Sequence, residues 1–573
     1  MIFMTATFTS AFTCRIIRSH LPTALLLVFA PLVVFAAAPV LPDAGAILQQ
    51  LVPVAPSAPS SNRGGLAIEQ TDASKMASSA PFLVESLQIT GNTLIDTPTL
   101  LALVANAKGK TLTLSELAEL SGLITAYYRS HDFPLARAII PPQSITRGVV
   151  RITVIEALYG VVTLDNSSQV NDDLLQATLS PLQTGQAISQ TKMDQVLLLL
   201  SDVPGVLVDA TFKPGSATGS SDFVVSTRPS QAVFGSVMLD NYGNRYTGPE
   251  RFSGALSMLN MLYHGDILNV NVLSSGRGMR YGRLGYEYLL NGVGTHMGAA
   301  YSTLNYVLGQ PITTDIHGSA QVGSVWARHP LVRSRDTNVY GQIQYDGLKL
   351  RDFYANTIQN DRSLANWTLN LSGDMRDQWL AGGGVNSWSL NWSAGRVVFD
   401  NSAAQLADVA TANTQGSFSK WNASAVRLQS ITSDALLYFT ALGQWASTNM
   451  DSSQRMSVGG PYTVRAYDIG AMSGDKGYFL SAEYRHNLGQ AWAGQWQAVA
   501  FMETAHVRVN TNTWTGMKGE NKGTLNGVGL GLNWTGSNQW SVKAYVAKPI
   551  GTAPQLAGST QSTRAWVELV RKL

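Results

Sequence analysis

The stretch Asn366-Trp-Thr-Leu-Asn-Leu371 alternates polar and apolar side chains residue by residue. The same alternation recurs in Trp388-Ser-Leu-Asn-Trp392 and in Val528-Gly-Leu-Gly-Leu-Asn-Trp534. Successive side chains of a β-strand point to opposite faces, so each run predicts a strand with one apolar face. The other face carries mostly Asn, Ser, Thr and Gly, where a soluble sandwich would place charges. This pattern favours a transmembrane β-barrel around a polar lumen, with a secreted soluble β-protein as the alternative.

The composition of the 573-residue chain points to the same class. Only 13% of the residues are Asp, Glu, Lys or Arg, about half the share of an average soluble protein. The hydrophobic share is an ordinary 45%, whereas a helical membrane protein would be more apolar and a disordered chain more charged. Beyond the N-terminal leader, no run of about 18 apolar residues offers a membrane helix. The net charge of +3 is too balanced to indicate a nucleic-acid partner.

The N-terminal region divides into three predicted parts. Residues 1–36 have the basic flank, the apolar core and the small-residue cleavage site of a secretory signal peptide, and they contain Cys14, the single cysteine. Residues 37–52 contain a predicted helix over 43–52. Asp43 can cap this helix, and its apolar stripe consists of Ile47, Leu48, Leu51 and Val52. Residues 53–80 are rich in Pro, Ala, Ser and Gly and are typical of a flexible linker.

Two small α+β units are predicted next, over 81–157 and 158–229. Each has the element order strand, helix, helix, strand, strand, and Thr113 and Glu116 form a capping box in the first. From 230 to 573 short alternating runs recur and no helix is expected. That length fits about 16 membrane strands of about 10 residues with turns and loops, and 14 or 18 strands fit almost as well.

No arrangement typical of catalysis is visible in the sequence. There is no nucleophile elbow and no phosphate-binding loop, and the eight histidines are scattered. Glu503 and His506, three residues apart on a predicted strand, face opposite sides and do not share a metal easily. We therefore expect no catalytic residues, no metal and no cofactor, and we do not expect an enzyme.

Six longer motifs follow one another along the chain: Pro42-Asp-Ala-Gly45, Leu87-Gln-Ile-Thr-Gly-Asn-Thr93, Gly148-Val-Val-Arg-Ile-Thr-Val-Ile-Glu156, Val203-Pro-Gly-Val206, Asp240-Asn-Tyr-Gly-Asn-Arg-Tyr-Thr-Gly248 and Gly459-Gly-Pro-Tyr-Thr-Val-Arg-Ala-Tyr467. In this order they resemble segments of the outer-membrane transporters of two-partner secretion, the hemolysin-activator-like branch of the Omp85 superfamily. These segments are the plug helix, the first POTRA domain (two motifs), the second POTRA domain, the opening barrel strand and the tip of the sixth loop.

The resemblance implies which residues matter. A loop around 455–475 should fold into the lumen, where Arg465 would meet the carboxylate of Glu503 on the wall. The implied loop-tip residues are Gly460, Val464, Arg465, Ala466 and Tyr467, the wall residues are Glu503 and Phe501, and the plug-helix residues are Asp43, Ile47, Leu48 and Leu51. The sequence departs from the family pattern at three places. Ala466 replaces a glycine, Phe501-Met-Glu-Thr-Ala505 replaces Phe-x-Asp-x-Gly, and the chain ends at Leu573 without a terminal aromatic.

The resemblance also implies a function. The chain would be an outer-membrane pore with its N-terminal domains in the periplasm. It would recognise an unfolded filamentous hemagglutinin- or hemolysin-like exoprotein through the POTRA domains and translocate it to the cell surface. The expected partners are this exoprotein, outer-membrane lipid and the barrel-assembly machinery, with no nucleic acid. An Omp85-type insertase that assembles outer-membrane proteins is the main alternative, and a plain porin is another.

Overall fold

The computed structural model describes residues 41–51, 80–380, 382–558 and 561–573. The predicted signal peptide and all but the last residue of the predicted linker lie outside these ranges. None of the helices within them is long and apolar enough to cross a membrane.

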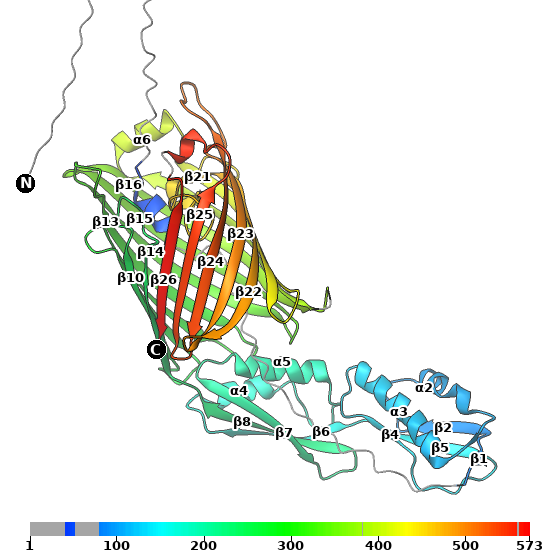
Figure 1. The fold of residues 1–573 in the computed structure, drawn as a ribbon. Helices are drawn as coiled ribbons and strands as arrows, with labels where there is room; N and C mark the ends of the chain where they lie inside the picture. The colour runs from blue at the N-terminus through cyan, green and yellow to red at the C-terminus, as the bar shows by residue number, and fades with distance from the viewer. Residues whose placement is uncertain (1–40, 52–79, 381, 559–560) are drawn as a thin grey trace, which may run out of the picture. The chain divides into compact units, whose positions relative to one another are not determined.

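Sixteen antiparallel strands form a closed barrel (Figure 1). They are β9 (Val233–Asp240), β10 (Arg251–Leu259), β11 (Ile267–Ser274), β12 (Met279–Leu289), β13 (His296–Val307), β14 (Ile316–Arg333), β15 (Thr337–Tyr354), β16 (Thr357–Asp377), β17 (Gly384–Phe399), β18 (Gly416–Ser430), β19 (Ala435–Ala446), β22 (Lys476–Ala491), β23 (Gly494–Arg508), β24 (Lys522–Gly536), β25 (Trp540–Pro549) and β26 (Arg564–Lys572). Strand β26 pairs with β9 and closes the ring. The predicted barrel of 16 strands is confirmed.

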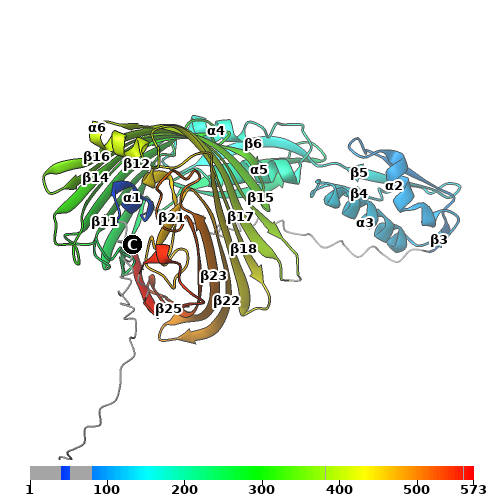
Figure 2. The ribbon, with the colours of Figure 1, turned by 90° about the horizontal axis from the view of Figure 1, so that it is seen from above.

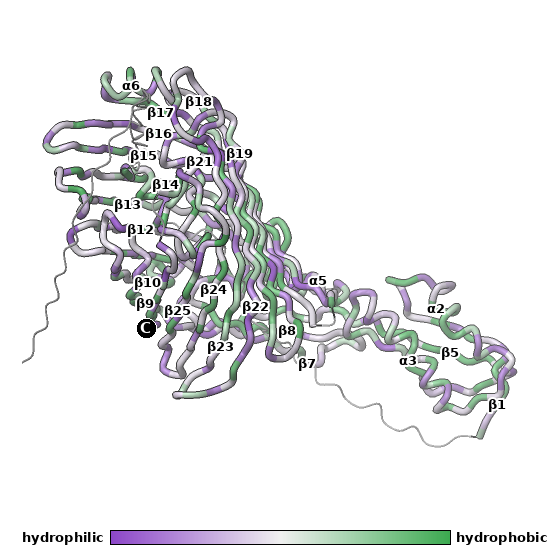
Figure 3. Tube along the Cα trace, turned by 45° about the horizontal axis from the view of Figure 1, so that its top comes forward, coloured by the Kyte–Doolittle hydropathy of each residue, from purple (hydrophilic) through white to green (hydrophobic). Residues whose placement is uncertain are grey.

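The alternation that predicted the strands is visible in the burial of their side chains. Trp367 and Leu369 of β16 are 52% and 47% exposed, as expected for residues on the lipid-facing side of the wall. The intervening Thr368 bonds Ser393 of β17 over 2.9 Å, on the inner face. Figure 3 shows hydrophobic and hydrophilic residues interleaved along the barrel strands. The barrel thus satisfies its backbone between strands and its polar side chains within the lumen.

Two α+β units precede the barrel. The first contains β1 (Phe82–Leu83), β2 (Ser86–Thr90), α2 (Thr97–Leu103), η1 (Ala105–Ala107), β3 (Thr111–Leu112), α3 (Leu114–Ser130), β4 (Arg137–Ile139) and β5 (Val149–Ile155). The second contains β6 (Leu158–Asn166), α4 (Asp172–Leu179), α5 (Gln190–Ser201), β7 (Val206–Pro214) and β8 (Ser220–Pro229). Their three-stranded sheets have the orders β2-β5-β4 and β6-β8-β7, each with one parallel and one antiparallel pair. Each unit packs its helices on its sheet through a separate apolar core.

Glu156 closes the first unit. Its carboxylate accepts hydrogen bonds from the backbone N–H groups of Thr93 and Leu94 and from the Tyr128 hydroxyl. Burial by itself raises the pKa of the Glu156 carboxyl, but these bonds outweigh it and hold the pKa below its usual value. The stabilisation from Glu156 is therefore present at neutral pH and is lost as the pH falls through that lowered pKa.

The structure corrects the sequence predictions at three helices. Of the predicted helix over 43–52, α1 spans Ala44–Gln49 and ends before residues 50 and 51, while residue 52 lies outside the described ranges. In the first unit, the first of the two predicted helices divides into α2 and the 3₁₀ turn η1. The expectation of no helix after Ser230 was wrong, because α6 (Ser402–Val409) lies between β17 and β18. The Asn401 side chain caps α6 by accepting from two backbone N–H groups, a signal that the sequence contains.

The lipid-facing residues of β16 provide a test of the barrel in lipid. We expect Leu369→Arg to lower the free energy of unfolding by about 2–4 kcal/mol, because an arginine on the lipid face near mid-membrane is costly. Asn370→Arg, on the adjacent lumen-facing position, is the matched control and should cost much less. Denaturant titration of the protein folded into lipid vesicles measures both values. Equal losses for the two variants would contradict the assigned faces.

Candidate functional site

The chain between β19 and β22 runs into the interior of the barrel. Its short strands β20 (Met456–Val458) and β21 (Met472–Gly474) pair with each other and form the stem of a loop. Figure 2, a view from above, shows β21 and α1 inside the ring of barrel strands. Val464, Ala466 and Tyr467 at the tip of the loop are almost fully buried against apolar residues of the wall. We call residues 459–469 the loop tip.

Two glycines shape the loop tip. Gly459 and Gly460 have φ angles of +99° and +101°, in the region that glycine adopts without steric cost. A Cβ at Gly459 would lie 2.4 Å from the carbonyl oxygen of Asp468. The Gly459 N–H donates to the Thr463 hydroxyl over 2.7 Å. The chain thus reverses tightly here and presents Arg465 to the wall.

Arg465 connects the loop tip to two neighbouring strands. Its backbone N–H and Nε donate to the Glu503 carboxylate on β23 over 2.7 and 2.6 Å. Its Nη2 donates to Glu483 on β22 over 2.5 Å, and Glu483 also accepts from Arg485. The structure therefore brings the sequence-predicted residues Arg465 and Glu503 together and adds a second carboxylate. Glu483 was not singled out as a partner, although the period of two along β22 places it on the same face as the buried Phe479 and Ser481.

The remaining surfaces of Arg465 are also in contact. Its guanidinium carbon lies 3.5 Å from the ring centroid of Phe501 and 4.9 Å from that of Tyr545, distances at which a cation is attracted to an aromatic face. Its carbonyl oxygen accepts a 2.7 Å hydrogen bond from the Trp566 indole on β26. No motif in the sequence indicates the contact with Trp566. The arginine is thus held through its backbone and its side chain together.

Ala466, which stands where the family pattern has a glycine, fits because the facing wall residue is a glycine. A Cβ at Gly527 of β24 would lie 2.7 Å from the Ala466 Cβ and 3.3 Å from a methyl carbon of Val464. The missing side chain on the wall therefore leaves the space that the alanine methyl occupies. Tyr467 is buried in the same cluster, while Tyr462 stacks edge-on against Tyr242 with ring centroids 5.7 Å apart.

Helix α1 lies in the lumen and is held by charge. Asp43 caps the helix by accepting from the Ala46 N–H, and the same carboxylate accepts from Arg362 of β16 over 2.6 Å and from Ser452 over 2.8 Å. Arg362 also contacts Asp352 of β15 and Asp451 of the loop. One buried guanidinium therefore joins α1, the barrel wall and the loop.

The apolar stripe of α1 packs on the wall as well. Ile47 is 1% exposed, and Leu48 and Leu51 pack against the same cluster of inward-facing barrel residues. On the opposite side α1 approaches the loop so closely that a Cβ at Gly45 would lie 2.6 Å from the Ser453 nitrogen. The four plug-helix residues predicted from the sequence are thus all in contact with the barrel interior.

Nothing in this arrangement resembles a metal or reaction centre. Within residues 41–51, 80–380, 382–558 and 561–573, no group of three or more His, Cys, Asp or Glu side chains could hold a metal ion. Several buried charges of the lumen are instead neutralised in pairs and small networks, as at Arg251 and Asp240, which lie 2.8 Å apart. The geometry is that of a lumen filled by two inward elements, each fixed to the wall by an arginine.

Comparison with known proteins agrees with this geometry. At 24% identity, the chain is similar to the heme/hemopexin transporter protein HuxB of Haemophilus influenzae over 78% of its own length and 80% of that protein. At 23% identity, it is similar to the outer membrane transporter CdiB of Escherichia coli over 79% of its own length and 76% of that protein. The solved structure of CdiB from Escherichia coli superposes with a TM-score of 0.66 at 20% identity, covering 89% of this chain and 93% of CdiB.

Two family models match the chain. The ShlB-type POTRA domain matches residues 82–157, the first α+β unit. The model of the haemolysin secretion/activation protein ShlB/FhaC/HecB matches residues 219–534, more than half of the chain. The protein therefore belongs to the ShlB/FhaC/HecB family, the outer-membrane transporters of two-partner secretion.

Proposed function

We propose that this chain takes up an unfolded, hemagglutinin- or hemolysin-like exoprotein through its two α+β units and passes it through the barrel to the cell surface. Family membership accounts for the coarser statement, an outer-membrane transporter that works with a secreted partner. The proposal that an exoprotein passes through the barrel rests on the two inward elements, α1 and the loop tip. Both occupy the lumen that an exported chain would have to cross.

Coexpression with the exoprotein partner tests the proposal directly. We expect the exoprotein in the medium when this chain is present, and retention in the periplasm when it is absent. The levels of other outer-membrane proteins should stay unchanged, because an insertase would affect their assembly. A fall in those levels with normal exoprotein secretion would favour the insertase alternative.

The open sheet edges of the α+β units support uptake of an extended chain. In the first unit the outer edge of β4 is covered, because the Ala138 N–H donates to Thr125 of α3 over 2.9 Å. Among the described residues, no strand pairs with the outer edge of β2, and in the second unit the same holds for β7. An extended peptide can add to such an edge through backbone hydrogen bonds with little demand on its sequence. We therefore assign β2 and β7 as docking edges for the exoprotein.

Site-specific crosslinking tests the docking edge of the first unit. A photoreactive residue at Gln88, exposed on β2, should crosslink to the exoprotein during secretion. The matched control is the same residue at Arg137, exposed on β4, the edge that α3 covers. We expect at least several-fold more product from position 88. Equal yields at both positions would contradict edge docking at β2.

We further propose that Arg465 keeps the loop tip in the conformation that secretion requires. Arg465→Ala should reduce secretion at least about tenfold, because several charge-assisted bonds are lost together. Arg465→Lys should not restore secretion, since one ammonium group cannot reproduce a planar fork between two carboxylates. Exoprotein in the medium is the readout, with heat-dependent gel mobility to verify that the barrel folds. Arg396→Ala, at an exposed arginine of β17, is the control and should secrete normally.

The helix α1 is proposed as a plug that leaves the lumen during transport. Deletion of 44–49 and Asp43→Asn should both raise the conductance of the protein in planar bilayers, because each removes contacts that hold the helix. Asp96→Asn is a matched control, since Asp96 caps α2 by the same chemistry outside the barrel. A deletion variant with wild-type conductance would refute the plug.

A further inference from the structure

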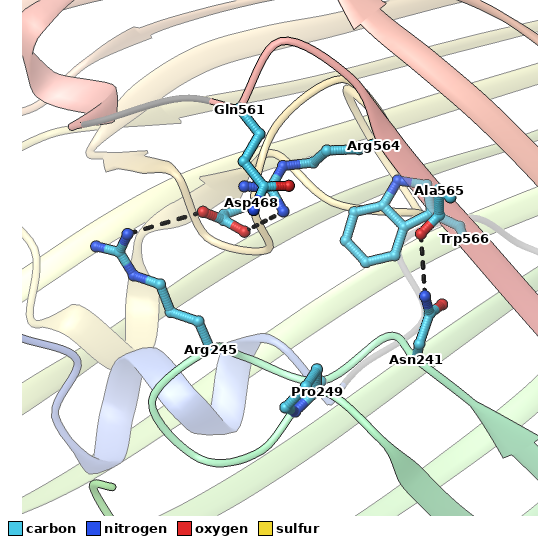
Figure 4. Close-up of a pocket in the computed structure, with 9 residues that line it drawn as sticks. Asn241, Arg245, Pro249, Asp468, Gln561, Arg564, Ala565 and Trp566 are labelled. Atoms are coloured by element: carbon cyan, nitrogen blue, oxygen red, sulfur yellow. Dashed lines mark hydrogen bonds and ion pairs between the residues drawn. The ribbon is translucent and has the colours of Figure 1, made fainter. Parts of the chain in front are cut away.

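A pocket of about 460 Å³ lies where the first and last barrel strands separate (Figure 4). The chain enters the barrel from the second α+β unit at the start of β9, so the end of β9 and the start of β26 point toward the cell surface. The walls of the pocket are the loop 241–249, the first residues of β26 and Asp468 of the loop tip. The pocket adjoins the contacts of the loop tip, because Trp566 in its lining also donates to the Arg465 carbonyl, but its lining contains neither Arg465 nor a residue of α1.

The pairing between the first and last barrel strands ends just before this pocket. Strands β9 and β26 pair only from Ser236 to Asp240 on the β9 side. Above that point the Asn241 side chain bridges the seam, donating to the Ala565 carbonyl over 3.0 Å and accepting from the Val567 N–H over 2.8 Å. Arg564 and Trp566 are two residues apart on β26, so their side chains lie on the same face of the strand. The Trp566 indole contacts the loop tip inside the barrel. The Arg564 side chain therefore lies on the lumen side.

Two guanidinium groups share one carboxylate in the pocket. Arg564 Nη1 lies 2.5 Å from Asp468 Oδ1, and Arg245 Nη1 lies 3.9 Å from Asp468 Oδ2. The Arg564 Nε is buried and has no hydrogen-bond partner in the part of the chain that the structure describes. One positive charge is thus uncompensated, and at least one donor is unused. A buried N–H without an acceptor is costly, so an anion here gains both a charge and a hydrogen-bond partner.

We propose that this pocket binds a phosphate group between Arg245 and Arg564. A carboxylate has only two acceptor oxygens. A phosphate offers more acceptor oxygens and can therefore accept from both arginines at once while Asp468 keeps its contact with Arg564. The phosphate could come from a lipid headgroup at the cell-surface rim or from free phosphate in the aqueous lumen, and the experiment separates these sources.

Calorimetric titration of the purified full-length protein with inorganic phosphate is the first test. Arg245→Gln and Arg564→Gln should each weaken binding about tenfold, as expected for the loss of a charged hydrogen bond. Asp468→Asn should tighten binding, because it removes the competing carboxylate and leaves two uncompensated positive charges. Arg277→Gln is the control and should bind like the wild type, since Arg277 is an exposed arginine of the neighbouring β11–β12 turn.

The second test identifies the source. Lipid A and its dephosphorylated form are added as competitors during the phosphate titration. If lipid A competes with phosphate and its dephosphorylated form does not, the pocket is assigned to a lipid headgroup. If neither form competes, the pocket is assigned to free phosphate. The proposal is overturned if the wild type shows no saturable phosphate binding, or if both arginine variants bind as it does. If either arginine variant fails to fold, the other variant and the tightening expected for Asp468→Asn still decide the outcome.

Discussion

The buried fork of Arg465 between Glu483 and Glu503 is the interaction on which the interior of this barrel depends. A guanidinium with 5% of its residue surface exposed requires partners, because an isolated buried charge costs several kcal/mol. Here both carboxylates come from adjacent strands, so the loop tip can satisfy its arginine only when β22 and β23 hold their register. These bonds therefore fix the position of the loop tip relative to the wall.

The second inward element depends on the same chemistry. Arg362 contacts carboxylates from α1, from β15 and from the loop segment before β20. Ser452 of that loop segment also donates a hydrogen bond to Asp43. The positions of α1 and of the loop in the lumen therefore depend on each other. Removal of α1 would leave Arg362 with its wall and loop partners, so its charge would remain compensated. The Arg362 guanidinium thus does not depend on α1 alone for its pairing.

The sequence predicted the barrel because period-two alternation is a local property that each strand carries by itself. It predicted Arg465 and Glu503 only through the family resemblance, since no spacing rule connects residues 38 positions apart. Glu483 and Trp566 were missed as partners of Arg465 because their role depends on the placement of the loop, which is a tertiary feature. Helix α6 was missed because its eight residues lie in a loop of ordinary composition. Asn401, its capping residue, was the available signal.

The facing pair of Ala466 and Gly527 has a consequence for how this site can vary. The two positions share one small volume, which holds a single methyl group and not two. A side chain larger than hydrogen at 527 therefore becomes tolerable only after 466 has become glycine, whereas two glycines leave a gap. The order in which substitutions occur then matters, so we expect these two positions to change together among relatives, as a compensated pair.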